Sequence, residues 1–204
     1  KVQFMLGDQR SLDEVIRELA NDGMITSFCT AGYRCGRTGD KIMNLLEKGF
    51  IANDEMERFP GVTHKAGVHP VMECTQNIPC NPCQDACPKH CIKIGEKITS
   101  LPAVDESVDC IGCGMCVASC SGQAIFLLDE TYEEGFAAVT LPYEFLPLPK
   151  EGEKGYGLGR DGKVVCEAEV VQVKTAKAFD HTNLLTIKVP ADMAMKARFY
   201  KKEA

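Results

Sequence analysis

Residues 73–94 read ECTQNIPCNPCQDACPKHCIKI, and residues 109–127 read DCIGCGMCVASCSGQAIFL. The first segment carries five cysteines and the second carries four. Each contains a run of four whose last three cysteines are separated by two residues and then by three. The first run is Cys74, Cys80, Cys83 and Cys87, and the second run is Cys110, Cys113, Cys116 and Cys120. Only the first step differs, with five intervening residues in one run and two in the other. This internal repeat indicates two related metal sites.

The short steps place several thiolates around one point, as a metal site requires and a disulfide network does not. In bacterial ferredoxins with two clusters, the cysteine before the proline ligates the other cluster. We therefore predict two [4Fe–4S] clusters with crossed ligands. Cluster one is assigned to Cys74, Cys80, Cys83 and Cys120, and cluster two to Cys110, Cys113, Cys116 and Cys87. Structural zinc is the alternative, but zinc sites favour pairs of cysteines over two sets of four. Ser121 replaces the usual proline in the second run, and we expect a mild effect.

Cysteines outside the repeat receive other interpretations. Cys91 aligns with Ala124 of the second copy, so we predict a buried, unligated side chain. The competing interpretation makes Cys91 a ligand in place of Cys74. We expect Cys166 to be a core residue of a strand and His90 to be exposed.

Composition and charge limit the classes of function. The 204 residues include 12 cysteines and carry a net charge of −6, to which bound clusters would add. An acidic chain argues against a nucleic-acid partner and suits docking to basic patches on redox partners. The longest apolar runs, such as 124–128, are too short to span a membrane. We predict no signal peptide and hence a cytoplasmic, thiol-reducing location, while the start at Lys1 leaves open whether sequence precedes it.

Hydrophobic periodicity divides the rest of the chain. A helix is predicted from Leu12 to Ala20 and a second one after Thr38. Alternating residues predict strands after position 135, with a hairpin turn at Asp161–Gly162 and a small antiparallel sheet or barrel. We therefore predict an α+β fold in which a dicluster ferredoxin-like domain is flanked by two others. The expected boundaries are 1–50 for a small α/β unit, 51–72 for a connector, 73–128 for the dicluster domain and 129–204 for a β-rich domain.

The motifs Glu73–Cys74, Ile78–Cys83 and Asp109–Gly114 resemble more than a generic ferredoxin. They are similar to the small iron–sulfur subunit of multisubunit flavin-dependent oxidoreductases that oxidise amino or imino acids. The resemblance continues through 141–144 to about Tyr200. It implies that Cys74 is a ligand, because the five-residue first step is usual in that family. It also implies a hetero-oligomer in which electrons pass between flavins of partner subunits and an outside acceptor.

The first 50 residues resemble a second family. The stretches SLDEVI (11–16), SFCTAGYR (27–34) and GRTG (36–39) are similar to the C-terminal region of the radical-SAM tyrosine lyase of [FeFe]-hydrogenase maturation. That family ligates an auxiliary cluster with a C-x2-C pair, but here Gly32 stands at the second position after Cys29. The radical-SAM core is also absent, so the lyase activity does not carry over.

A third metal centre is a further hypothesis. Cys29 and Cys35 could join His64, His69 or another subunit around it. The alternative is two unligated cysteines in a retained docking fold. Two nearby cations, Arg34 and Arg37, could contact a carboxylate or a flavin phosphate.

Two functions follow from these patterns. The first is a non-catalytic subunit that relays single electrons beside a flavoprotein, in an amino-acid-oxidising, hydrogenase or bifurcating complex. The second is a maturation or scaffold protein for a metalloenzyme such as a hydrogenase. Sequence does not give the reduction potentials, because these depend on hydrogen bonds to sulfur and on solvent access.

Overall fold

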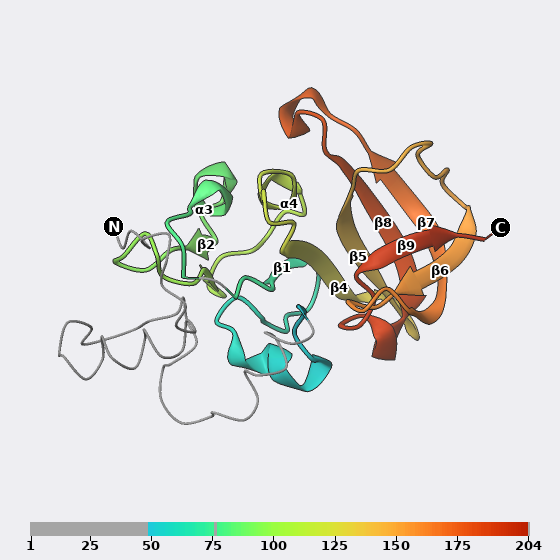
Figure 1. Ribbon diagram of the computed structural model, residues 1–204, viewed down its shortest axis with the longest axis horizontal. Helices are drawn as coiled ribbons and strands as arrows, with labels where there is room; N and C mark the ends of the chain where they lie inside the picture. Colours follow the sequence, from blue (N-terminus) through green and yellow to red (C-terminus); the bar gives the residue numbers. More distant parts are fainter. Residues whose placement is uncertain (1–48, 76, 204) are drawn as a thin grey trace, which may run out of the picture. The chain divides into compact units, whose positions relative to one another are not determined.

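A seven-stranded antiparallel sheet dominates the computed structural model, which describes residues 49–75 and 77–203 (Figure 1). The order of its strands is β1 (His69–Met72), β4 (Ile125–Glu133), β5 (Phe136–Tyr143), β8 (Asn183–Pro190), β7 (Val164–Lys174), β6 (Lys154–Leu158) and β9 (Phe199–Lys202). All of the described residues belong to one compact unit of the chain.

The prediction of an α+β, ferredoxin-like fold is wrong, because the described part of the chain is β-rich. Its α-helices are α3 (Pro82–Ala86) and α4 (Met115–Ala118), of five and four residues. The 3-10 turns are η1 (Asn53–Arg58), η2 (Lys177–Phe179) and η3 (Ala191–Met193). Each α-helix carries one cysteine of its run, Cys83 in α3 and Cys116 in α4, and ends before the next one. The helices expected at 12–20 and after Thr38 lie outside the described residues. None of the helices within the described ranges is long and apolar enough to cross a membrane.

The predicted antiparallel strands of the C-terminal part are confirmed. Strand β5 pairs with β8, and β8 pairs with β7, so the alternating segments share one sheet. The turn at Asp161–Gly162 joins β6 to β7, and Gly162 has the positive φ of 75° that such a turn favours. Strand β5 continues through Pro142 to Tyr143, and Pro142 pairs with Leu184 of β8.

The cysteine-rich segment is an excursion from this sheet. It leaves at the end of β1 and returns at the start of β4, where Met72 pairs with Ile125. Between these strands lie α3, the small hairpin of β2 (Ile92–Lys93) and β3 (Ala103–Val104), and then α4. Figure 1 shows α3 and α4 close together. The boundary expected at 128/129 falls inside β4.

Strand β4 separates two hydrophobic cores. Ile125 and Leu127 pack with the cysteines, while Phe126 and Leu128 pack within the sheet. Because successive side chains of a strand point to opposite faces, a single strand serves both cores. The sheet therefore forms one wall of the cysteine region.

Candidate metal-cluster sites

Four cysteines from both runs line a first cavity, here called cavity one. They are Cys74, Cys80, Cys83 and Cys120. Its remaining wall is mostly apolar and includes Ile78, Ile94 and Ile125. These are the four residues assigned to cluster one, and Cys120 reaches them from the other run.

A second cavity, cavity two, lies among five cysteines. They are Cys87, Cys91, Cys110, Cys113 and Cys116. Pro70, Ile111 and Leu127 form an apolar part of its wall, and Lys89 also lines it. The set contains the four residues assigned to cluster two, with Cys87 contributed by the first run.

Local backbone features place these side chains. Cys83 lies in the first turn of α3, with Pro82 at the start of the helix, and Cys87 caps its end. Gly114 precedes α4 with a positive φ of 84°, which lets the chain turn between two cysteines of cavity two. A Cβ at Gly114 would lie 2.2 Å from Leu184 Cδ1, so this side-chain methyl group of β8 would have to move.

Backbone amides point at sulfur in both cavities. The Gly112 amide lies 3.4 Å from Cys110 Sγ, and the Ala124 amide lies 3.4 Å from Cys120 Sγ. Hydrogen bonds of this kind stabilise negative charge on sulfur and tune metal–thiolate sites. Both cavities therefore have backbone amides that donate toward sulfur.

The thiols of each cavity disfavour ionisation of one another. Burial, followed by the nearby thiols of Cys120, Cys80 and Cys74, raises the pKa of Cys83 to about 11. Burial followed by neighbouring thiols likewise raises the pKa values of Cys116 and Cys110. Several thiolates can share such an apolar space only if a cation offsets their charge.

The two neighbouring thiols of cavity two are not equivalent. Cys87 Sγ and Cys91 Sγ lie 3.4 Å apart. Burial, followed by the hydrogen bond to Cys87, raises the pKa of Cys91 to about 12. For Cys87, burial alone would raise the pKa, but hydrogen bonds from the Cys91 backbone and side chain outweigh it and lower the pKa. The Cys87 and Cys91 sulfur atoms lie within hydrogen-bond distance of each other, and either can be the donor.

The location of Cys91 bears on both earlier interpretations. Its predicted burial is confirmed, since only 2% of the residue is exposed. The competing interpretation required Cys91 at cluster one, but Cys91 lines cavity two, whereas Cys74 lines cavity one.

The cysteine side chains are spread around each cavity and are not close enough together to bind one metal ion. Within residues 49–75 and 77–203, no three His, Cys, Asp or Glu side chains are grouped closely enough to hold a single metal ion. A [4Fe–4S] cluster is bound by four thiolates, each on a different iron atom, so its ligands spread around a larger core. Four thiols around an apolar cavity fit such a group in number and in chemistry.

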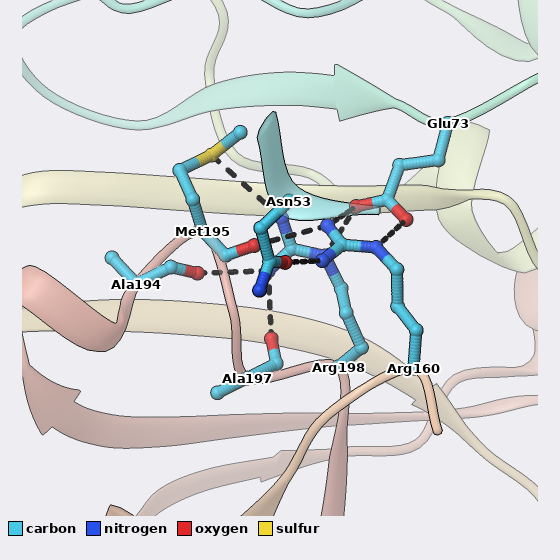
Figure 2. Close-up of polar contacts among 7 residues, drawn as sticks. All are labelled: Asn53, Glu73, Arg160, Ala194, Met195, Ala197 and Arg198. Atoms are coloured by element: carbon cyan, nitrogen blue, oxygen red, sulfur yellow. Dashed lines mark hydrogen bonds and ion pairs between the residues drawn. The ribbon is translucent and has the colours of Figure 1, made fainter. Parts of the chain in front are cut away.

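A buried ionic group is joined through the chain to a cysteine of cavity one, and sequence reasoning missed it. Glu73 directly precedes Cys74, and its carboxylate accepts hydrogen bonds from Arg160 and Arg198 (Figure 2). Burial alone would raise the pKa of Glu73, but the hydrogen bonds and charges of the two arginines hold it below its usual value. Arg160 and Arg198 lie 87 and 125 residues from Glu73 along the chain, so no local sequence pattern predicts these contacts.

A lysine from the sheet contacts the backbone of a cysteine that lines cavity two. Lys174 of β7 donates from Nζ to the carbonyl oxygen of Cys113 at 2.9 Å. Its ammonium also lies 5.5 Å from the ring centroid of Phe179, within the range of a cation–π contact. The alternating pattern of the strand did not predict these contacts of Lys174.

The two histidines considered for a third centre have other partners. His64 contacts Glu57 at 2.9 Å and Glu130 at 3.2 Å. His69 is buried, and its ring nitrogens lie 2.9 Å and 3.0 Å from the carbonyl oxygens of Gly67 and Thr63. Neither imidazole lines a cysteine cavity.

The remaining candidates divide into described and undescribed residues. His90 is exposed, as expected, and follows the end of α3 in a turn with a φ of 54°. Cys166 lies in β7 as expected, half-buried at the margin of the sheet core. The other candidates, Cys29, Cys35, Arg34 and Arg37, lie outside the described residues.

No protein-family model, curated protein or solved structure matches this chain. The arrangement of the cysteines and of the charges around them therefore supplies the basis for a functional proposal.

Proposed function

We propose that this chain is an electron-transfer subunit that holds two [4Fe–4S] clusters, one in each cysteine-lined cavity. One observation carries the proposal. Cavity one contains the four cysteines that the repeat assigns to cluster one, and cavity two contains the four that it assigns to cluster two. Cys120 lies with the first run and Cys87 with the second. Burial of cysteines for packing alone does not explain why one cysteine of each run lies with the cysteines of the other run.

The two cavities share a wall, which favours passage of electrons between them. Ile125 lines cavity one, and Leu127 of the same strand lines cavity two. Residues two apart in a strand lie on one face and are separated by about 6.6 Å along it. Clusters in both cavities would thus be near neighbours.

The protein's own contribution is to bind, shield and orient. The bound clusters would supply one-electron redox chemistry. The thiols would hold the irons, isoleucine and proline side chains give both cavities an apolar lining, and the amides of Gly112 and Ala124 donate toward sulfur. Substrate chemistry then belongs to a partner, for which the family resemblance favours a flavoprotein in a cytoplasmic hetero-oligomer.

Anaerobic reconstitution of the full chain tests cluster binding. We expect about eight iron and about eight sulfide per chain, with the electron paramagnetic resonance (EPR) signals of two reduced clusters. Cys83→Ser should damage mainly cluster one and Cys113→Ser mainly cluster two. Cys166→Ser is the matched control, because Cys166 lines neither cavity. A chain that binds zinc in place of iron and sulfide, or two single variants that keep both signals at full strength, would contradict the proposal.

A second experiment separates electron transfer from cluster assembly. Anaerobic isolation of the native complex should recover a flavoprotein in stoichiometric amount. The reconstituted chain should keep its clusters through repeated redox cycles when an apo-acceptor is present. Rapid transfer of the clusters to the apo-acceptor would instead favour the scaffold function.

A further inference from the structure

We propose that the sheet sets the reduction potentials of the two clusters separately, through a buried ionic group that begins next to Cys74 and through a lysine that donates to the carbonyl oxygen of Cys113. The ionic group is Glu73, Arg160 and Arg198, and the lysine is Lys174. The inference rests on the proposed function, because it concerns clusters held in these cavities.

The ionic group is buried and carries a net positive charge. The side chains of Glu73, Arg160 and Arg198 are 9%, 8% and 5% exposed. Two guanidinium groups share one carboxylate, so the formal sum is +1. Arg160 donates from Nε to Glu73 Oε2 at 2.7 Å, and both arginines donate to Oε1 (Figure 2).

The remaining donors hold the arginines in place. Arg198 donates to the carbonyl oxygens of Ala194 and Ala197 at 2.8 Å and 2.7 Å, and its guanidinium lies 5.0 Å from the Phe126 ring centroid. Arg160 also donates to Asn53 and to the Met195 carbonyl oxygen. The positive charge is therefore fixed by many contacts, and it is not free to move away when a nearby cluster changes its charge.

The group is joined directly to the first ligand of cluster one. Glu73 precedes Cys74, and its amide donates to the Ala124 carbonyl oxygen at 2.7 Å. No helix or strand occurs among the described residues between β1 and α3, so Glu73 anchors the loop that carries Cys74. Reduction adds one negative charge to a cluster, and a fixed positive charge in a buried setting stabilises the reduced form.

Cavity two has different cations near it: Lys89 of the cysteine-rich segment lines it, and Lys174 comes from the sheet. Lys174 reaches the carbonyl oxygen of Cys113, which is itself an assigned ligand. The ammonium is a single charge with no carboxylate among its described contacts, and it lies over Phe179 of the core around the cysteines. Its removal should lower the potential of cluster two alone.

EPR-monitored potentiometric titration of the reconstituted full chain tests both parts. Glu73→Gln keeps the shape of the side chain but raises the group from +1 to +2, so the midpoint potential of cluster one should rise. Lys174→Met should lower the potential of cluster two, and Lys174→Arg should leave it close to wild type. Lys201→Met, which removes a cation from the exposed face of β9, should shift neither cluster.

The outcomes separate this inference from the proposed function. Wild-type protein without two [4Fe–4S] signals would overturn the proposed function and this inference with it. Two signals whose potentials are unchanged in Glu73→Gln and Lys174→Met, or move equally in both variants, would overturn this inference alone. If Glu73→Gln loses cluster one, the comparison of Arg160→Lys with Arg160→Met tests the role of the charge. The methionine variant lacks the positive charge, so its cluster-one potential should be the lower of the two. Equal potentials would refute the role of the charge.

Discussion

Cys91 Sγ lies 3.4 Å from Cys87 Sγ inside cavity two, although the matching position of the second copy is Ala124. The repeat is therefore not symmetric in its sulfur chemistry. The first copy contributes Cys91, a fifth thiol in cavity two that lies within hydrogen-bond distance of an assigned ligand. The second copy has Ala124 at the equivalent position.

Replacement of this fifth thiol tests its role. Cys91→Ala should keep both EPR signals and the full iron content, because the four assigned ligands of each cavity remain. We expect a loss of about 1 kcal/mol in the free energy of unfolding, as for a small change in a buried side chain. Cys87→Ala should by contrast damage cluster two. Loss of cluster one in Cys91→Ala would restore Cys91 as the ligand in place of Cys74, and loss of cluster two would make it a ligand there.

Gly114 should be intolerant of any side chain. It combines a φ of +84° with a Leu184 methyl group that would lie 2.2 Å from an added Cβ. Gly114→Ala should destabilise the chain by about 2–4 kcal/mol, from backbone strain and overpacking together. Urea unfolding of the metal-free protein measures this effect, and reconstitution should show a weaker cluster two. Gly122→Ala is the matched control, because a Cβ added there would have no neighbour within 4 Å, so it should change stability by less than about 0.5 kcal/mol. Equal effects of the two substitutions would refute the packing argument.

The sequence predicted the contents of the cavities better than the fold class. The repeat paired Cys120 with the first run and Cys87 with the second, because ligand spacing is local and duplicated. Alternation likewise predicted the C-terminal strands. The α+β assignment failed because the helices of the two cysteine runs are only five and four residues long. The contact between Glu73 and Arg198 spans 125 residues and depends on the sheet, so no local pattern could predict it.

His64 should titrate above the ordinary range of histidine. Hydrogen bonds to Glu57 and then Glu130 raise its pKa above 6.5, against a smaller opposing effect of burial. A raised pKa means that the contact stabilises the fold fully below pH 6.5, and that this stabilisation is lost as the pH rises through the folded-state pKa. NMR titration of the His64 ring measures the value directly. Glu57→Gln and Glu130→Gln should each lower it, and an unchanged pKa in both variants would contradict the assignment.

Acid should weaken the buried ion pairs of Glu73 with Arg160 and Arg198. The arginines hold the pKa of Glu73 below the usual carboxyl value of 4.5, so its contribution is fully present above that pH and disappears as the pH falls through the lowered folded-state value. At pH 7, Glu73→Ala should cost about 3–5 kcal/mol, because it leaves two buried guanidinium groups without their carboxylate. Urea unfolding of wild type and Glu73→Ala between about pH 7 and pH 3 measures the difference, which should narrow only at the acidic end. Glu151→Ala, at an exposed carboxylate, is the control and should cost less than about 1 kcal/mol at every pH. A difference between wild type and Glu73→Ala that is already small at neutral pH would mean that the buried group does not hold the Cys74 loop to the sheet.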